Sequence, residues 1–207
     1  MIIQLYNKII KIRLLSVAKM SSAVLVFLGI CLAWQMVEAQ LVYKLTKVEC
    51  QVNQTRVSNF SCHLKAINWN LALLNMDAFL IIPALNPVVR AQVFKKDYSN
   101  QYKPFLVDVS IKICEVIEKR NFITYGVMLW KIMKRFTNVN HSCPFSGPLK
   151  SRNGYLDTSL LPPFPQAFYQ VSLIVVDLNS TNKDYIGTMK FYLQVMDQIK
   201  IKKIPKA

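Results

Sequence analysis

The chain has 207 residues, 53% of them hydrophobic, and a formal net charge of +15 at pH 7. A basic excess of this size is compatible with nucleic acid, heparin-like polymers or anionic membrane surfaces. Lys and Arg are scattered, however, with clusters only at 131–135 and 200–206, and no nucleic-acid-reading module accompanies them. We therefore exclude nucleic acid as a partner and expect a solvated basic face that attracts anionic surfaces.

The first segment in chain order, residues 1–39, has the pattern of a secretory signal peptide. A basic leader precedes the uncharged apolar run Ser21–Trp34, and small residues end the segment at Ala39, after which we expect cleavage. The apolar run falls short of the roughly 20 residues that cross a bilayer, so an uncleaved anchor is the minor alternative. Met20 is an alternative start. Residues 40–207 keep a net charge near +12 and suit a single domain with its own core.

Cysteine usage agrees with an oxidising compartment. Beyond the leader, an even number of cysteines predicts two disulfides, with three possible pairings. No pair has the short spacing of a zinc site, and only His63 and His141 could complete one, so we expect no metal and no cofactor. The four cysteines are Cys50, Cys62, Cys114 and Cys143.

Four asparagines stand in glycosylation sequons, which a chain in the secretory pathway presents to the modifying enzyme. Those that are used must lie on the surface of the folded protein. The four acceptors are Asn53, Asn59, Asn140 and Asn179.

The remaining chain is dominated by the alternation of apolar and polar residues that is typical of half-buried antiparallel strands. In 168–178, every second residue from Tyr169 to Val175 falls on one face. In 186–195, every second residue from Met189 to Val195 does the same, and the turn residues between the two segments predict a hairpin. Further strands are predicted over 41–50, 60–67, 71–82 (with Leu74, Met76, Ala78 and Leu80 on one face) and 88–94.

The pattern changes over 106–136, where apolar residues recur with a helical period. Two short helices are predicted in this region, the second with Leu129, Ile132, Met133 and Phe136 facing inward. Strands separated by turns, together with two disulfides, indicate an all-β sandwich of about seven antiparallel strands with a short helical insertion.

Several stretches carry a family resemblance. The segment Cys143–Val195 resembles the C-terminal half of the ML (lipid-recognition) superfamily, the group of the Niemann-Pick type C sterol carrier, the group-two mite allergens and the ganglioside activator. In that group a Cys-Pro pair precedes a tyrosine strand, a proline-rich bend and a long hairpin. The motifs CHLKAINWN (62–70), YKPFLVDVSIKICEVI (102–117) and HSCPFSG (141–147) together resemble an insect-expanded family of secreted proteins of unknown function placed near that superfamily.

The resemblance implies an immunoglobulin-like sandwich that holds a lipid between its two sheets. Many ML proteins tie the first cysteine to one in the last strand, but that strand has none here, so we infer the pairs Cys50–Cys62 and Cys114–Cys143. A filled core is the alternative to a lipid cavity. The large inward residues that would line the cavity are Phe79, Phe105, Tyr169, Val171, Leu173, Phe191 and Leu193.

The motif HSCPFSG also resembles a nucleophile loop, because it places His141, Ser142 and Cys143 side by side. Adjacent residues in an extended loop point apart, and no glycine-flanked elbow surrounds the serine, so we expect no catalytic residue and no enzyme activity. Two functions remain. The first is a secreted carrier of a lipid or small hydrophobic ligand, suited to chemosensation; the second is an extracellular adaptor that binds a receptor or a glycan through its basic face without a lipid.

Overall fold

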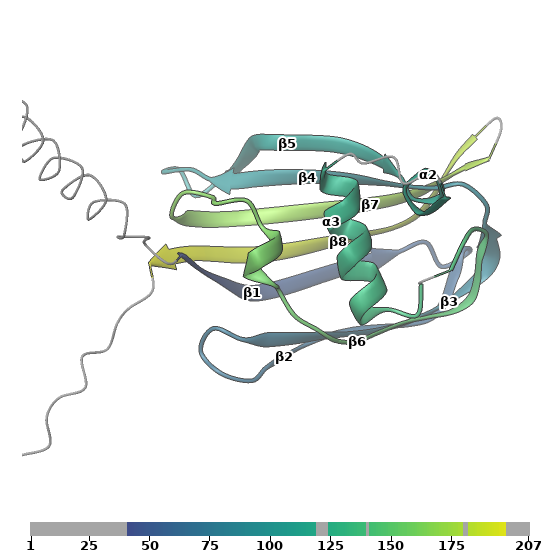
Figure 1. Ribbon diagram of the computed structural model, residues 1–207, viewed down its shortest axis with the longest axis horizontal. Coiled ribbons are helices and arrows are strands. Elements are labelled where there is room, and N and C mark those ends of the chain that lie inside the picture. Colours follow the sequence, from purple (N-terminus) through teal and green to yellow (C-terminus); the bar gives the residue numbers. More distant parts are fainter. Residues whose placement is uncertain (1–40, 119–123, 140, 180–181, 198–207) are drawn as a thin grey trace, which may run out of the picture. The chain divides into compact units, whose positions relative to one another are not determined.

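The structure of the protein is a computed structural model that describes residues 41–118, 124–139, 141–179 and 182–197. The predicted signal peptide, the sequon at Asn140 and the basic cluster at 200–206 lie outside the described residues. The described segments build two antiparallel sheets, with two helices between two of the strands (Figure 1).

Eight strands form the β-sandwich, which confirms the predicted all-β class. The larger sheet has the strand order β1-β8-β7-β4-β5, and the smaller sheet has the order β2-β3-β6. The strands are β1 (Leu41–Val52), β2 (Val57–Ala66), β3 (Ala72–Ala84), β4 (Pro87–Lys96), β5 (Tyr102–Lys112), β6 (Phe145–Gly154), β7 (Ala167–Asn179) and β8 (Asn182–Asp197).

The helical insertion consists of the short α2 (Ile113–Glu118) and the longer α3 (Thr124–Phe136). It begins later than predicted because 106–112 continues β5, in which Val107 and Ile111 alternate into the core and are 7% and 1% exposed. Strand β6 was not predicted from alternation, because its sequence FSGPLKSRNG has glycines and a proline where a strand usually has apolar residues. A short 3-10 turn, η1 (Thr158–Leu160), follows it.

The two sheets are joined differently along their two sides. On one side, the Cys50–Cys62 disulfide links β1 to β2. On the other side β5 and β6 are not neighbours in a sheet, and α3 crosses the gap between them (Figure 1). The Cys114–Cys143 disulfide ties α2 to the segment that enters β6. Both pairings inferred from the sequence are therefore present.

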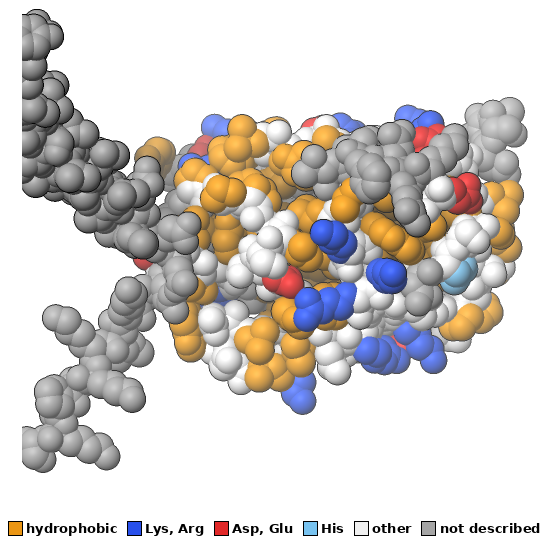
Figure 2. All heavy atoms as spheres, viewed as in Figure 1, with side chains coloured by type: hydrophobic (Ala, Val, Ile, Leu, Met, Phe, Trp, Pro, Cys, Tyr) orange, Lys and Arg blue, Asp and Glu red, His pale blue; other side chains and the backbone are white. Residues whose placement is uncertain are grey.

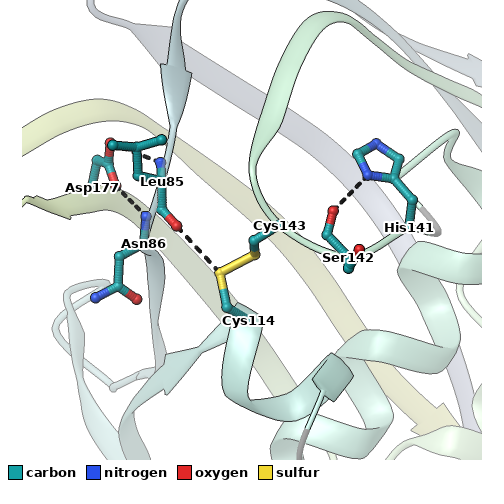
Figure 3. Close-up of a disulfide and its surroundings, with 7 residues drawn as sticks. All are labelled: Leu85, Asn86, Cys114, His141, Ser142, Cys143 and Asp177. Carbon is teal, nitrogen blue, oxygen red and sulfur yellow. Dashed lines mark hydrogen bonds between the residues drawn. A yellow bond between two sulfur atoms is a disulfide. The ribbon is translucent and has the colours of Figure 1, made fainter.

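A buried ion pair closes one end of the sandwich. Arg56, in the turn between β1 and β2, pairs with Asp177 of β7 at 3.2 Å and also with Asp184 of β8. Asp177 accepts the backbone N–H groups of Leu85 at 3.2 Å and Asn86 at 2.8 Å (Figure 3). Because a charge buried without partners is costly, this network fixes three turns of the fold relative to one another.

Candidate ligand cavity

An apolar cavity of about 370 Å³ lies between the two sheets and α3. This volume falls in the range of roughly 300–1,000 Å³ that is typical of small-molecule sites. Both sheets contribute to the wall, for example through Leu74 and Met76 of β3 and through Val89 and Ala91 of β4. The lining residues with polar side chains are Tyr125, Thr137, Lys150, Ser151 and Tyr155. The space therefore suits a ligand that is itself mostly hydrocarbon.

The structure brings some of the predicted lining residues to this wall. Residues of β7 and β8 that face each other across the hairpin point to the same side, as the pairing of Val171 with Phe191 illustrates. Phe79 is a correction, because its side chain is 43% exposed on the outer face of the smaller sheet. The alternation of β3 that turns Leu80 inward necessarily turns Phe79 outward. The predicted residues that line the cavity are Val171, Leu173, Phe191 and Leu193.

Two other predicted lining residues, Phe105 and Tyr169, do not reach the cavity. They belong to an aromatic plug, formed by Tyr43, Phe105, Phe164 and Tyr169, at the end of the sandwich where β1 begins. Tyr169 is fully buried, its ring stacks on Phe164 with centroids 5.2 Å apart, and the Phe105 ring lies 5.6 Å away. The plug therefore forms the end wall of the cavity, which it reaches through Phe164.

Hydrogen bonds hold the aromatic plug to the proline-rich segment after η1. The Tyr43 hydroxyl donates to the carbonyl of Pro162 at 2.7 Å and accepts the N–H of Phe164 at 2.9 Å. The Tyr169 hydroxyl donates to the carbonyl of Pro165 at 2.7 Å. Burial raises the pKa of Tyr169, so it stays neutral. The plug thus satisfies its polar atoms and sets the spacing of the sheets at this end.

Helix α3 forms a wall that sequence reasoning did not assign to the site. The helical period of the sequence predicted its inward face correctly, but it could not show that the helix covers a gap between two sheets. Spacings of three and four residues place one apolar stripe against the cavity. The lining residues on the helix are Tyr125, Met128, Leu129, Ile132, Met133 and Phe136.

The end of α3 is fastened to the segment after β6 by an α3 latch, formed by Arg135, Tyr155 and Asp157. Arg135 pairs with Asp157 at 2.9 Å and donates a second hydrogen bond to the Tyr155 hydroxyl. The Phe136 ring meets the Tyr155 ring edge-on, with centroids 4.9 Å apart. Hydrogen bonds from Ser159, followed by the charge of Arg135, lower the pKa of Asp157. The carboxylate of the latch is therefore ionised at neutral pH.

Directly after α3, the chain is also bonded to the free edge of β6. The N–H of Asn138 donates to the carbonyl of Lys150 at 3.1 Å, and the Asn138 side-chain oxygen accepts the N–H of Lys150 at 2.7 Å. The Asn138 side-chain amide also donates to the carbonyl of Pro148 at 2.7 Å. This α3–β6 seam borders the cavity, because Thr137, Lys150 and Ser151 all line it.

The motif HSCPFSG forms a turn that the Cys114–Cys143 disulfide holds in place. Cys143 is bonded to Cys114, so its sulfur is not available as a nucleophile (Figure 3). The Nδ1 atom of His141 lies 2.7 Å from the carbonyl oxygen of Ser142, and its ring packs edge-on against Phe145 at 5.3 Å. In Figure 3 the His141 side chain stands apart from the disulfide. The motif thus positions the entry to β6 beside α2.

The predicted glycosylation sites differ in their surroundings. Asn59 is exposed on β2. Asn53 is half-buried, and its side-chain amide donates to the carbonyl of Tyr185 at 3.1 Å while its oxygen accepts the N–H of Thr55. Asn179 ends β7, next to residues outside the described segments. Asn59 is therefore the most accessible of the described acceptors.

Comparison with known families gives a match over part of the chain. Residues 89–171 match the model of a family described as a protein of unknown function (DUF1091). The match spans β4, β5, both helices, β6 and the start of β7, so it includes the helical insertion that covers the cavity. It confirms the predicted similarity to an uncharacterised family. No curated protein matches the chain.

Two further properties of the described residues bear on the site. Neither α2 nor α3 is a helix with the length and apolar character needed to cross a bilayer. Within the same segments, no group of three or more His, Cys, Asp or Glu side chains is arranged to hold a metal ion. The apolar cavity is thus the feature of the described fold from which a function can be argued.

Proposed function

We propose that the protein is a secreted carrier that holds a lipid or another small hydrophobic ligand between its two sheets. The observation that carries this proposal is the apolar cavity of about 370 Å³, which both sheets and α3 line. Protein interiors normally leave few voids larger than a water molecule, so a cavity of this size in a small sandwich calls for an occupant.

The energetics of such a site favour reversible burial of hydrocarbon. Each CH₂ group moved from water into an apolar wall gains about 0.8 kcal/mol. Side chains that line the cavity, such as Leu173, Met189 and Phe191, offer dispersion contacts without any polar partner. A ligand with a flexible or rigid apolar body would therefore bind without a covalent step.

The proposal of a secreted protein draws on the chain's disulfides and its predicted signal peptide. Disulfides form and persist in oxidising compartments, and Cys50–Cys62 and Cys114–Cys143 fasten both sides of the sandwich. The resemblance to the ML superfamily supports the same proposal, because lipid burial between two sheets is what that resemblance implies. A role in chemosensation is one use of such a carrier.

Native mass spectrometry of the protein secreted from insect cells tests this function. We expect a co-purified mass in addition to any glycans, which is released when the protein is denatured and is extracted into organic solvent. A matched sample in which Leu173 is replaced by Arg would lose the extra mass, because a charge would stand in the apolar wall. A clean apoprotein that also takes up no fluorescent fatty acid or sterol would favour the extracellular adaptor instead.

A further inference from the structure

Exposed hydrophobic residues are concentrated on the smaller sheet. In the described segments nine large hydrophobic residues are exposed, and six of them lie on β3 or in the turns on either side of it. The six are Ile67, Trp69, Phe79, Ile81, Ile82 and Leu85. An antiparallel sheet in a sandwich normally carries polar residues on its solvent side, so this surface offers apolar contacts that the fold itself does not use.

The pairing of the strands shows which side chains share the outer face of this sheet. Phe79 and Ile81 point outward because Leu80, which lies between them, is buried. Cross-strand partners lie on the same face, so Pro148 of β6, the partner of Phe79, is outward as well. The opposite face of β3 lines the cavity, for example through Leu74 and Leu80. A single strand thus lies between the cavity and the exposed face.

The charges on this outer face are mainly positive. The strands β2, β3 and β6 contain three basic residues and one acidic residue, Asp77. Arg152 pairs with Asp77 at 2.5 Å, which neutralises that carboxylate. Lys150 is the cross-strand partner of Asp77 and is exposed, and Lys65 is exposed on β2 opposite Leu73. Figure 2 shows hydrophobic and basic side chains next to each other along the lower margin of the view, where β2 and β6 lie in Figure 1. The face therefore suits an anionic partner.

The distribution of the apolar residues favours a lipid bilayer over a protein as this partner. Ile67 and Trp69 lie in the turn before β3, whereas Phe79 and Ile81 lie near its far end, about 20 Å away along the strand. Protein interfaces concentrate their binding energy in a packed central cluster. A bilayer instead accepts separate apolar side chains across its whole surface, holds aromatic rings at the level of the head groups and attracts lysines when its lipids are anionic.

We propose that the outer face of the smaller sheet docks on an anionic bilayer, with Trp69 and Phe79 at the level of the head groups and Lys65 and Lys150 beside them. The docked protein takes up or releases its ligand at that surface. This inference rests on the proposed carrier function and adds the membrane as the partner, because a ligand that is mostly hydrocarbon partitions into bilayers and is exchanged there.

Binding of the secreted protein to vesicles tests the docking without any added ligand. Vesicles of equal parts phosphatidylcholine and phosphatidylserine are compared with vesicles of phosphatidylcholine alone, by co-sedimentation over a range of lipid concentrations. We expect tighter binding to the anionic vesicles, and we expect added salt to remove most of the difference between the two because it screens exposed charges.

Matched variants locate the docking surface on the smaller sheet. Lys65→Glu should weaken binding to the anionic vesicles by about 25-fold, because it removes one positive charge and adds a negative one at about fivefold each. Lys44→Glu, on the outer face of the larger sheet, should bind like the parent protein. Phe79→Ser should weaken binding to both kinds of vesicle by about fivefold, since it removes a half-exposed ring. Phe168→Ser, at a residue that is similarly exposed on the larger sheet, should not.

The fluorescence of Trp69 reports its insertion directly. Beyond the predicted signal peptide the chain has two tryptophans, so Trp130→Phe leaves Trp69 as the single reporter. On the anionic vesicles its emission should shift to shorter wavelengths and should be quenched by lipids that are brominated on their acyl chains. An emission that stays that of a water-exposed indole on vesicles that bind the protein would contradict the proposed orientation.

Failure of the docking is distinguishable from failure of the carrier, because uptake of a fluorescent fatty acid from solution requires the cavity and no vesicle. The sequon at Asn59 lies on β2, so the glycosylated protein and Asn59→Gln are both measured. Uptake of the fatty acid without vesicle binding in either form would overturn the inference and leave the carrier. Equal weakening by Lys65→Glu and Lys44→Glu would also overturn it. So would self-association, in place of vesicle binding, that Phe79→Ser abolishes, because it would assign the face to a second copy of the chain. Vesicle binding through this face without uptake would reject the carrier while the docking surface stands.

Discussion

The aromatic plug and the cavity are built by neighbouring parts of the same strands, yet one is filled and the other is hollow. Tyr169 and Val171 are two residues apart on β7 and both point inward, but Tyr169 is fully buried among rings whereas Val171 lines the cavity. At the plug, the proline-rich segment brings Phe164 between the sheets and hydrogen bonds hold it there. At the cavity, α3 bridges β5 and β6 from outside and keeps them apart.

This difference indicates how the fold separates stability from binding. The plug at one end is tightly packed, and the Arg56 ion pairs with Asp177 and Asp184 join the turns near the other end, so both ends fix the distance between the sheets. The region between them then cannot collapse onto itself. Residues in the two regions should therefore respond differently to the same kind of substitution.

The largest effect is expected in the plug. Tyr169→Ala should lower the free energy of unfolding by about 3–5 kcal/mol, because it removes a fully buried ring and its hydrogen bond to Pro165. Chemical denaturation measures this loss directly. Tyr169→Phe, which keeps the ring and removes only the hydroxyl, is the matched control and should cost about 1 kcal/mol. A loss below that of the control would show that the plug is not the packed end.

The second effect concerns the Cys114–Cys143 disulfide, which ties the helical insertion to the segment that enters β6. The double variant Cys114→Ser/Cys143→Ser should lose about 2–4 kcal/mol of stability and should also bind ligand more weakly, because α2 and α3 are no longer held to the entry of β6. Cys50→Ser/Cys62→Ser should lose a similar stability with a smaller change in ligand affinity. This disulfide links β1 to β2, on the side of the sandwich away from α3. Equal losses of affinity in both variants would contradict the division between the two sides.

A smaller loss is expected in the cavity wall. Phe191→Ala should cost about 1–2 kcal/mol, less than a tightly packed aromatic side chain, because one side of the Phe191 ring faces the cavity. The comparison with Tyr169→Ala is direct, since both positions face inward on paired strands. Denaturation curves that gave both variants the same loss would indicate a closed core.

The smallest effect is expected at the α3 latch, and it depends on pH. The pKa of Asp157 is lower in the folded protein than the ordinary Asp pKa of about 3.9. Its contribution to stability is therefore complete above that ordinary pKa and is lost as the pH falls toward the lowered pKa of the folded state. Asp157→Asn should cost less than about 1 kcal/mol. The difference between its thermal midpoint and that of the parent should be the same at pH 7 and pH 5 and should shrink below about pH 4. A difference that disappears already at pH 5 would contradict this assignment.

Most of the framework could be predicted from the sequence because alternation reports which side of a strand is buried. The prediction for 186–195 placed Phe191 and Leu193 on the inward face, where they lie. The prediction that Phe79 lines the cavity was wrong because it rested on the size of the side chain. The alternation of β3 already placed Leu80 in the interior and therefore placed Phe79 on the outer face. Strand β5 was not predicted, because its last residues merge with the helical pattern of α2 and the whole of 106–136 was assigned to helices.

The cavity itself could not be predicted from the sequence. A filled core and a hollow one need the same inward apolar residues, so the pattern of β7 and β8 is compatible with both. What decides between them is the position of α3, which depends on β6, and β6 has no alternating pattern. The latch between Arg135 and Asp157 joins residues 22 positions apart that no local pattern links.

The most direct test of the central claim is the thermal midpoint of the parent protein and of Phe191→Ala, each measured with and without an excess of oleate. A ligand that binds the folded state raises the midpoint, and the rise grows with the logarithm of the ratio of ligand concentration to Kd. We predict a clear rise for the parent protein and a smaller rise for Phe191→Ala, because the variant loses part of the wall that contacts the tail. A parent protein whose midpoint does not respond to oleate, oleyl alcohol or a sterol would contradict the account of the cavity as a ligand site.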